Sequence, residues 1–98
     1  SGYIFAKLEG ESPASNQAGN LFAYHIGGFK KAFDATRTIE LILSRNAQES
    51  TPIHITADID KWFSGPFRLS IAATPNCQSP GALAIQIANN YANMFSVN

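Results

Sequence analysis

The residues best suited to chemistry are the two histidines of the chain, His25 and His54. Alternation along the chain places each of them on the side of a strand opposite the main apolar face. Neutral imidazoles are ligands for copper and zinc, and a thioether such as that of Met94 would favour Cu(I). If the two strands are neighbours in one sheet, the imidazoles can converge on a metal, which would still need a third ligand. The alternative is that both are ordinary surface histidines.

Other reactive side chains lack the neighbours that chemistry needs. Asp58 and Asp60 supply too few oxygens for calcium and are better suited to cap the turn that follows them. Cys77 is the only cysteine, so no internal disulfide forms, and no activating base lies near it in sequence. Trp62 and Phe63 are expected as hydrophobic anchors beneath a short turn. No acid–base or nucleophile constellation is found, so the sequence does not predict an enzyme.

The composition is that of one small domain. The chain has 98 residues, a formal net charge of zero and only 14% charged residues. Its one adjacent basic pair is Lys30–Lys31, whereas nucleic-acid binding needs a clustered basic face. No run of about 20 apolar residues is present, so no membrane span is predicted. The low charge suggests that part of the surface is covered by another polypeptide.

Strand patterns dominate the first three quarters of the chain. The segments predicted as strands are residues 3–9, 21–26, 36–44, 53–59 and 67–72. The inward-facing side chains of three of them are expected to be Phe22, Tyr24 and Ile26; Ile39, Leu41 and Leu43; and Ile53, Ile55, Ala57 and Ile59. Polar loops are expected at residues 10–20 and 46–52, and Gly27–Gly28 is interpreted as a turn because no helix start follows it.

The last predicted element is an amphipathic helix. Ser79 is expected as its N-cap, with Pro80 at the first helical position. The apolar stripe recurs at four-residue intervals and consists of Leu83, Ile87, Tyr91 and Phe95, widened by Ile85, Ala88 and Met94. The opposite side is expected to carry Asn89, Asn90 and Asn93. Tyr91 and Phe95 are therefore predicted to be buried structural anchors, and the fold class is mainly β with a C-terminal amphipathic helix.

Five strands and one helix leave sheet edges that proteins normally cover. We therefore expect a partner, either another protein chain or an N-terminal half of the same domain. Residues 1–98 are then a single domain or the C-terminal half of a larger one.

Several segments, taken in order, resemble one known family. They are residues 3–10 (YIFAKLEG), 25–28 (HIGG), 57–63 (ADIDKWF), 79–83 (SPGAL) and 87–97 (IANNYANMFSV). This order resembles the second half of the MbnP-like domain, a family that is named after a protein associated with the copper chelator methanobactin and includes many Bacteroidetes lipoproteins. The resemblance covers nearly all of the chain and about half of a typical member.

The resemblance implies an Ig-like or Greek-key β-sandwich, a periplasmic or cell-surface location, and copper binding. In the family, copper is held by histidines and by an oxidised tryptophan that has a histidine two positions beyond it. Here the position two after Trp62 is Ser64, which weakens the transfer of that site.

Two functions follow from the sequence. The first is a cell-envelope binding protein that handles copper, with His25 and His54 as candidate ligands. The alternative is a structural or accessory interaction subunit of a larger outer-membrane or cell-surface complex, without metal.

Overall fold

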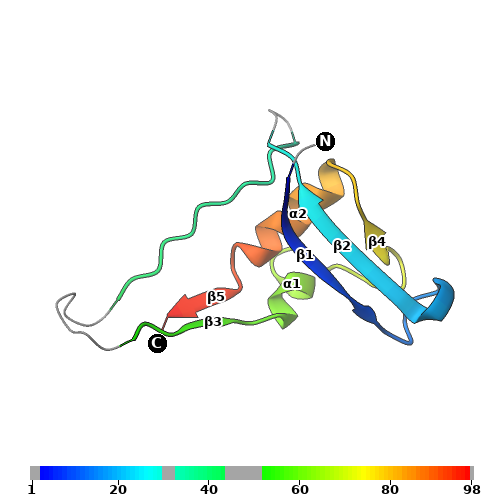
Figure 1. Cartoon of the computed structure of the whole chain (residues 1–98), viewed down its shortest axis with the longest axis horizontal. Helices are drawn as coiled ribbons and strands as arrows, with labels where there is room; N and C mark the ends of the chain where they lie inside the picture. The colour runs from blue at the N-terminus through cyan, green and yellow to red at the C-terminus, as the bar shows by residue number, and fades with distance from the viewer. Residues whose placement is uncertain (1–2, 30–32, 44–51, 98) are drawn as a thin grey trace.

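A computed structural model describes residues 3–29, 33–43 and 52–97, and its strands form two small sheets with two helices beside them (Figure 1). The elements in chain order are β1 (Ile4–Glu11), the 3-10 turn η1 (Ala18–Asn20), β2 (Leu21–Gly27), β3 (Ile55–Ala57), α1 (Asp60–Ser64), β4 (Asn76–Cys77), α2 (Ala82–Tyr91) and β5 (Phe95–Val97). Among these elements, no helix is long and apolar enough to cross a bilayer.

The larger sheet is built on an antiparallel hairpin. Its order is β1–β2–β4, with Leu8 opposite Tyr24 in the hairpin and β4 running parallel to β2. The alternating residues of β2 separate as the sequence predicts, because Tyr24 and Ile26 are fully buried while His25 faces the other side. The two predicted strands at residues 3–9 and 21–26 are confirmed.

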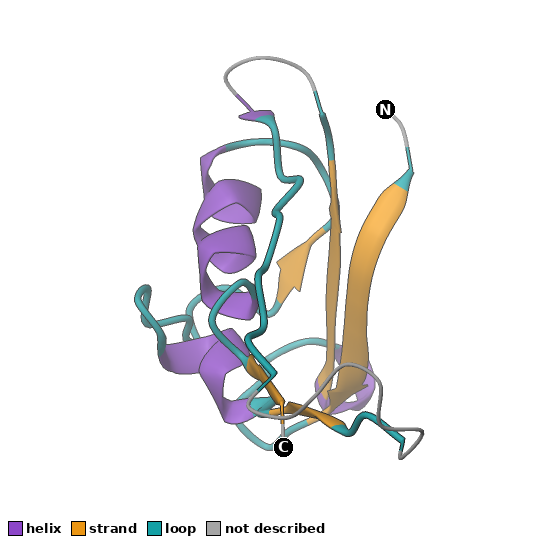
Figure 2. Ribbon diagram, turned by 90° about the vertical axis from the view of Figure 1, so that its left-hand side faces the viewer, coloured by secondary structure: helices purple, strands orange, loops and turns teal. Residues whose placement is uncertain are grey.

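Helix α2 closes the core on one face of this sheet, and the described elements leave the opposite face bare (Figure 2). The buried apolar core consists of Tyr24, Ile26, Ala35, Trp62, Leu69, Cys77, Ala84, Ile87, Ala88 and Tyr91. A fully buried Ile or Tyr of this kind stabilises the fold by roughly 1.5–3 kcal/mol. The core therefore depends on residues from both ends of the chain.

Three polar side-chain groups at the core, one amide and two hydroxyls, form hydrogen bonds that hold loops against it. Asn90 donates to the carbonyls of Trp62 and Phe67, both at 2.7 Å, and accepts from the Phe67 N–H at 2.8 Å. The hydroxyl of Tyr24 donates to the carbonyl of Thr74 at 2.8 Å, and that of Tyr91 donates to the carbonyl of Ala35 at 2.9 Å. Asn90, expected on the polar side of the helix, is fully buried, so that expectation is wrong.

The second sheet has only two strands of three residues each. β3 pairs antiparallel with β5, with Thr56 opposite Ser96. The strand predicted at residues 53–59 is thus shortened, and its apolar residues Ile53, Ile55 and Ile59 are exposed rather than buried. Alternation predicts burial only where a second layer covers the strand, and no described element covers this one.

Other predictions need correction. The described part of the segment 36–44 is extended without pairing in a sheet, and residues 67–72 form no strand. The helix begins at Ala82 after Gly81, without the expected side-chain cap from Ser79. It ends at Tyr91, so the half-buried Phe95 lies in β5, and the last described element is this strand rather than the predicted helix. Lys30, Lys31 and residues 46–51 of the loop predicted at 46–52 lie outside the described residues.

Candidate functional site

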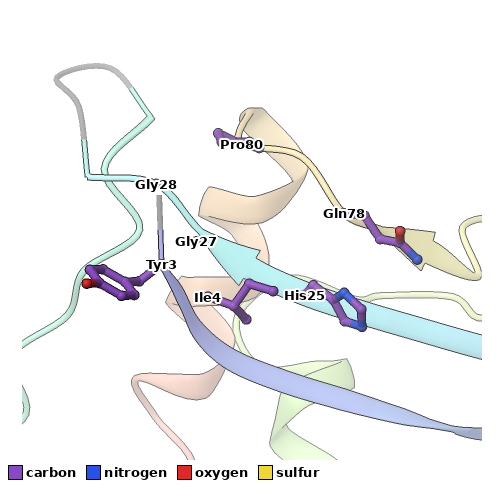
Figure 3. Close-up of a pocket in the computed structure, with 7 residues that line it drawn as sticks. All are labelled: Tyr3, Ile4, His25, Gly27, Gly28, Gln78 and Pro80. Carbon is purple, nitrogen blue, oxygen red and sulfur yellow. The ribbon is translucent and has the colours of Figure 1, made fainter. Parts of the chain in front are cut away.

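The first candidate site is a cavity of about 180 Å³ at the end of the β1–β2 hairpin. We call it the His25 cavity. It is lined by Tyr3, Ile4, His25, Gly27, Gly28, Gln78 and Pro80. Figure 3 shows the imidazole of His25 and the amide of Gln78 at one end and the ring of Tyr3 at the other. The chain thus brings one imidazole and one amide together in a shallow, mostly apolar hollow.

The glycines of this cavity are required by packing. A Cβ on Gly27 would lie 2.3 Å from the carbonyl oxygen of Tyr3, so only glycine lets the two strands approach. Gly28 has a φ of 100°, which side-chain-bearing residues rarely adopt. This agrees with their interpretation as a turn. Backbone packing and conformation explain why both residues are glycine, without any role in binding a ligand.

A carboxylate orients His25. Nε2 of the imidazole lies 2.6 Å from Oε2 of Glu9, which is one residue pair further along the same face of the hairpin. An ionised carboxylate can only accept, so Nε2 donates the proton of this hydrogen bond, and in the neutral imidazole the lone pair is then on Nδ1. The hydrogen bond from His25 is the main reason that the pKa of Glu9 is lowered, and the nearby Lys7 ammonium at 3.9 Å adds to it.

The two histidines lie in different parts of the fold. His25 is on β2 in the three-stranded sheet, whereas His54 directly precedes β3 of the two-stranded sheet and is exposed. His25 and His54 are therefore not on neighbouring strands of one sheet, which a metal site shared by the two imidazoles would require. Met94 lies beside β5 and is half-buried. The described residues contain no group of three or more His, Cys, Asp or Glu side chains that could hold a metal ion.

Trp62 is a packing residue in this chain. It is 3% exposed, and its ring lies 5.4 Å from that of Tyr91, centroid to centroid. Its Nε1 is buried without a hydrogen-bond partner among the described residues. Phe63, half-buried, packs edge-on against Phe22 and Tyr24. With Ser64 two positions later, the surroundings of Trp62 do not fit the copper site that the resemblance implies.

Asp58, Asp60 and Cys77 also have structural surroundings. Asp58 accepts from the N–H of Asp60 at the start of α1, which is the turn-capping role expected for it. The Cys77 thiol is buried on the core side of β4, and burial raises its pKa. A thiol with a raised pKa is a poor nucleophile at neutral pH.

The second candidate site is a larger groove of about 360 Å³ beside β1. We call it the β1 groove. It is lined by Phe5, Ala6, Ala35, Thr36, Arg37, Ile39, Tyr91, Met94 and Phe95. These residues come from β1, from the extended segment at 35–39, and from the end of α2 with the start of β5. The groove is therefore an apolar hollow that runs from the larger sheet toward the smaller one.

Arg37 is the cation of the β1 groove. Its guanidinium donates to the side-chain oxygen of Asn89 at 2.9 and 3.1 Å and to the backbone carbonyls of Asp34 and Thr36. All of these acceptors are neutral, and the nearby carboxylate of Asp34 interacts with the guanidinium through space, since Arg37 helps to lower the pKa of Asp34 after its hydrogen bonds from Thr36. The guanidinium is thus held in place by neutral acceptors without a direct hydrogen bond to a described carboxylate, so an incoming carboxylate could add one.

The edge of β1 adjoins this groove. β1 is the outermost strand of the larger sheet, and no described strand pairs with its outer edge. Tyr3, which precedes it, is 83% exposed, and Ile4 and Phe5 at its start are 53% and 42% exposed. An unpaired edge with exposed apolar residues is a typical place for another strand to bind.

Sequence reasoning missed the groove and the two polar residues that shape these sites. Glu9 was part of a strand pattern, and nothing linear pairs it with His25, 16 positions away. Arg37 faces Asn89 across 52 positions. The only available signal was the i, i+2 spacing of Lys7 and Glu9, which places both on one face of a strand.

The described residues thus form a small strand-rich fold with a carboxylate–histidine pair on β1 and β2 and an unpaired strand edge. The MbnP family model matches residues 1–79. The chain belongs to the MbnP family. The match ends before α2 and β5. No curated protein and no solved structure matches the chain.

Proposed function

We propose that this chain is a non-catalytic binding module of the cell envelope that works by accepting a further polypeptide strand at the edge of β1. The observation that carries the proposal is the unpaired outer edge of β1 beside the apolar β1 groove. An added strand would gain main-chain hydrogen bonds along the edge, and its side chains would enter the groove. The envelope location rests on the family relationship.

The exposed apolar residues support the same proposal. Ile42, Ile53 and Ile55 are 87%, 53% and 60% exposed, and Ile55 belongs to a two-stranded sheet that is too small to be stable alone. One or more added strands would cover them and join the two sheets into a β-sandwich. The chain would then be the C-terminal half of a larger domain or one subunit of a complex.

Site-specific photo-crosslinking in the native host tests this proposal. A photoreactive amino acid replaces Phe5, which lines the groove, and in a matched variant it replaces Arg68, an exposed residue outside the groove. We expect a discrete crosslinked polypeptide from position 5 and not from position 68. Identical products from the two positions, or no product from position 5, would refute strand docking.

Copper binding is the second candidate function, with His25 as the ligand that this chain contributes. It is favoured by the hydrogen bond between Nε2 and Glu9, because ligating histidines commonly donate their other N–H to a carboxylate. The free Nδ1 would be the ligand atom. Too few ligands are present among the described residues, so the remainder would come from the docked polypeptide.

This second candidate is tested by metal analysis of the protein purified from its native host, together with its partner. We expect bound copper that is lost in the variant His25→Ala and retained in His54→Ala. Retention of copper in both variants would exclude His25 as the ligand, and the absence of copper from the native complex would remove the copper function.

A further inference from the structure

We propose that the strand docked on β1 is the β1 strand of a second copy of this chain, antiparallel to the first about a two-fold axis at Leu8. The inference rests on the proposed strand-accepting edge and names its occupant. It is drawn from the pattern of charges along β1, which is complementary to itself in one register.

The charged residues of β1 share one face of the sheet. Lys7 lies opposite His25 and Glu9 lies opposite Ala23 in the hairpin, so both point to the face that α2 does not cover. Their side chains are 56% and 49% exposed. On that face the order along the regular part of the strand is Lys7, Glu9 and Glu11, and a bulge between Ile4 and Ala6 interrupts the alternation before Lys7.

A two-fold antiparallel pairing fixes which residues meet. With the axis at Leu8, Lys7 of each copy lies directly opposite the partner's Glu9, so two pairs of opposite charge form at once. An axis at Lys7 places two lysines opposite each other, and an axis at Glu9 does the same with two glutamates. An axis at Ala6 places no charged residue of the partner opposite Lys7. Directly opposed unlike charges stabilise strand pairing and like charges destabilise it, so the register at Leu8 is favoured.

The core-facing side of β1 is compatible with the same register. Leu8, which is half-buried against the core, meets the partner's Leu8, and Ala6 meets the partner's Gly10. The two three-stranded sheets would join into one six-stranded sheet with no unpaired β1 edge. An interface made mainly by one strand from each copy is small, so we expect reversible, concentration-dependent association.

Charge-reversal variants test the register directly. Lys7→Glu places Glu opposite Glu in both pairs, and Glu9→Lys places Lys opposite Lys, so each variant alone should associate poorly. When the two are mixed, every pair is again of opposite charge, so they should form a heterodimer. The double variant Lys7→Glu/Glu9→Lys should regain self-association for the same reason.

The measurement is sedimentation velocity from about 10 µM to about 1 mM, a range that suits a small interface. We expect the wild type to dimerise, and each single variant to raise the dissociation constant by about tenfold or more, since two cross-strand pairs change sign. The control is Lys61→Glu, an equal charge change at an exposed position of α1, which should dimerise as the wild type does. Circular dichroism establishes that each variant remains folded.

A monomeric wild type throughout this range would overturn the proposal, and so would dimerisation that neither single variant weakens or that mixing does not restore. Such a failure is distinguishable from failure of the proposed function. If the wild type is monomeric but position 5 still crosslinks to a different polypeptide, the β1 edge accepts a strand and only the identity of that strand is wrong.

Discussion

Removing the side chain of Asn90 should lower the free energy of unfolding by more than its small size suggests. Its side chain is fully buried and makes three hydrogen bonds, two to carbonyl oxygens and one to an N–H of the segment 62–67. Asn90→Ala leaves those three backbone groups without partners, and each buried unsatisfied group costs roughly 1–3 kcal/mol. Part of the segment stays open to water, so we expect a loss of about 3–5 kcal/mol. That is a large fraction of the roughly 5–15 kcal/mol that stabilises a small domain.

Urea unfolding followed by tryptophan fluorescence measures this change, because Trp62 is the only tryptophan and its carbonyl is one of the acceptors. The matched control is Asn89→Ala on the same helix, an exposed residue whose amide oxygen accepts from the half-buried Arg37, and its loss should cost less than about 2 kcal/mol. In thermal unfolding, Asn90→Ala should lower Tm by roughly 15–30 °C. If the two variants unfold alike, the buried amide does not hold the 62–67 segment.

Three further predictions concern the hairpin and the helix. Hydrogen bonding to His25 lowers the pKa of Glu9 below its ordinary value of 4.5. The ionised Glu9 therefore stabilises the folded state above pH 4.5, and this stabilisation is lost as the pH falls through the lowered pKa. Urea unfolding between pH 3 and 6 should therefore show a shallower acid loss in Glu9→Gln, and equal slopes would contradict this. Gly27→Ala places a Cβ 2.3 Å from a backbone oxygen and should cost at least about 2 kcal/mol. The control Gly10→Ala meets only the end of a phenyl ring at 2.9 Å and should cost less than about 1 kcal/mol. Equal losses of stability in denaturant unfolding would contradict the close approach of the two strands at Gly27. Tyr91→Phe removes one buried hydroxyl and should cost about 1–2 kcal/mol by the same measurement, and no change would mean that its bond to the segment at 35 is unimportant.

The strands of the hairpin could be predicted because alternation and burial agree there. Tyr24 and Ile26 are covered by α2, so the apolar side of β2 is also the buried side. The same alternation at Ile53 and Ile55 predicts burial that the described chain does not provide. A sequence pattern indicates that one face of a strand is covered, but it does not indicate which polypeptide covers that face.

The helix was predictable in kind but not at its ends. Ile87 and Tyr91 lie on the buried stripe, and the helix stops before Phe95 because residues 95–97 pair with β3 instead. Asn90 lies three positions after Ile87, so the helical period itself places it at the margin of the buried face. Its amide was assigned to solvent because its partners, 23 and 28 positions earlier, cannot be found by local reasoning.

The contacts that close the core have a consequence for how the chain acquires its structure. Tyr91 reaches Ala35 across 56 positions, and Tyr24 reaches Thr74 across 50. Contacts so distant in sequence form late and make folding slow. The hairpin alone leaves Tyr24 and Ile26 without cover until α2 has been synthesised. A nascent chain therefore stays open until α2 has emerged, and a fragment limited to residues 1–79, the stretch that matches the family model, should not fold by itself.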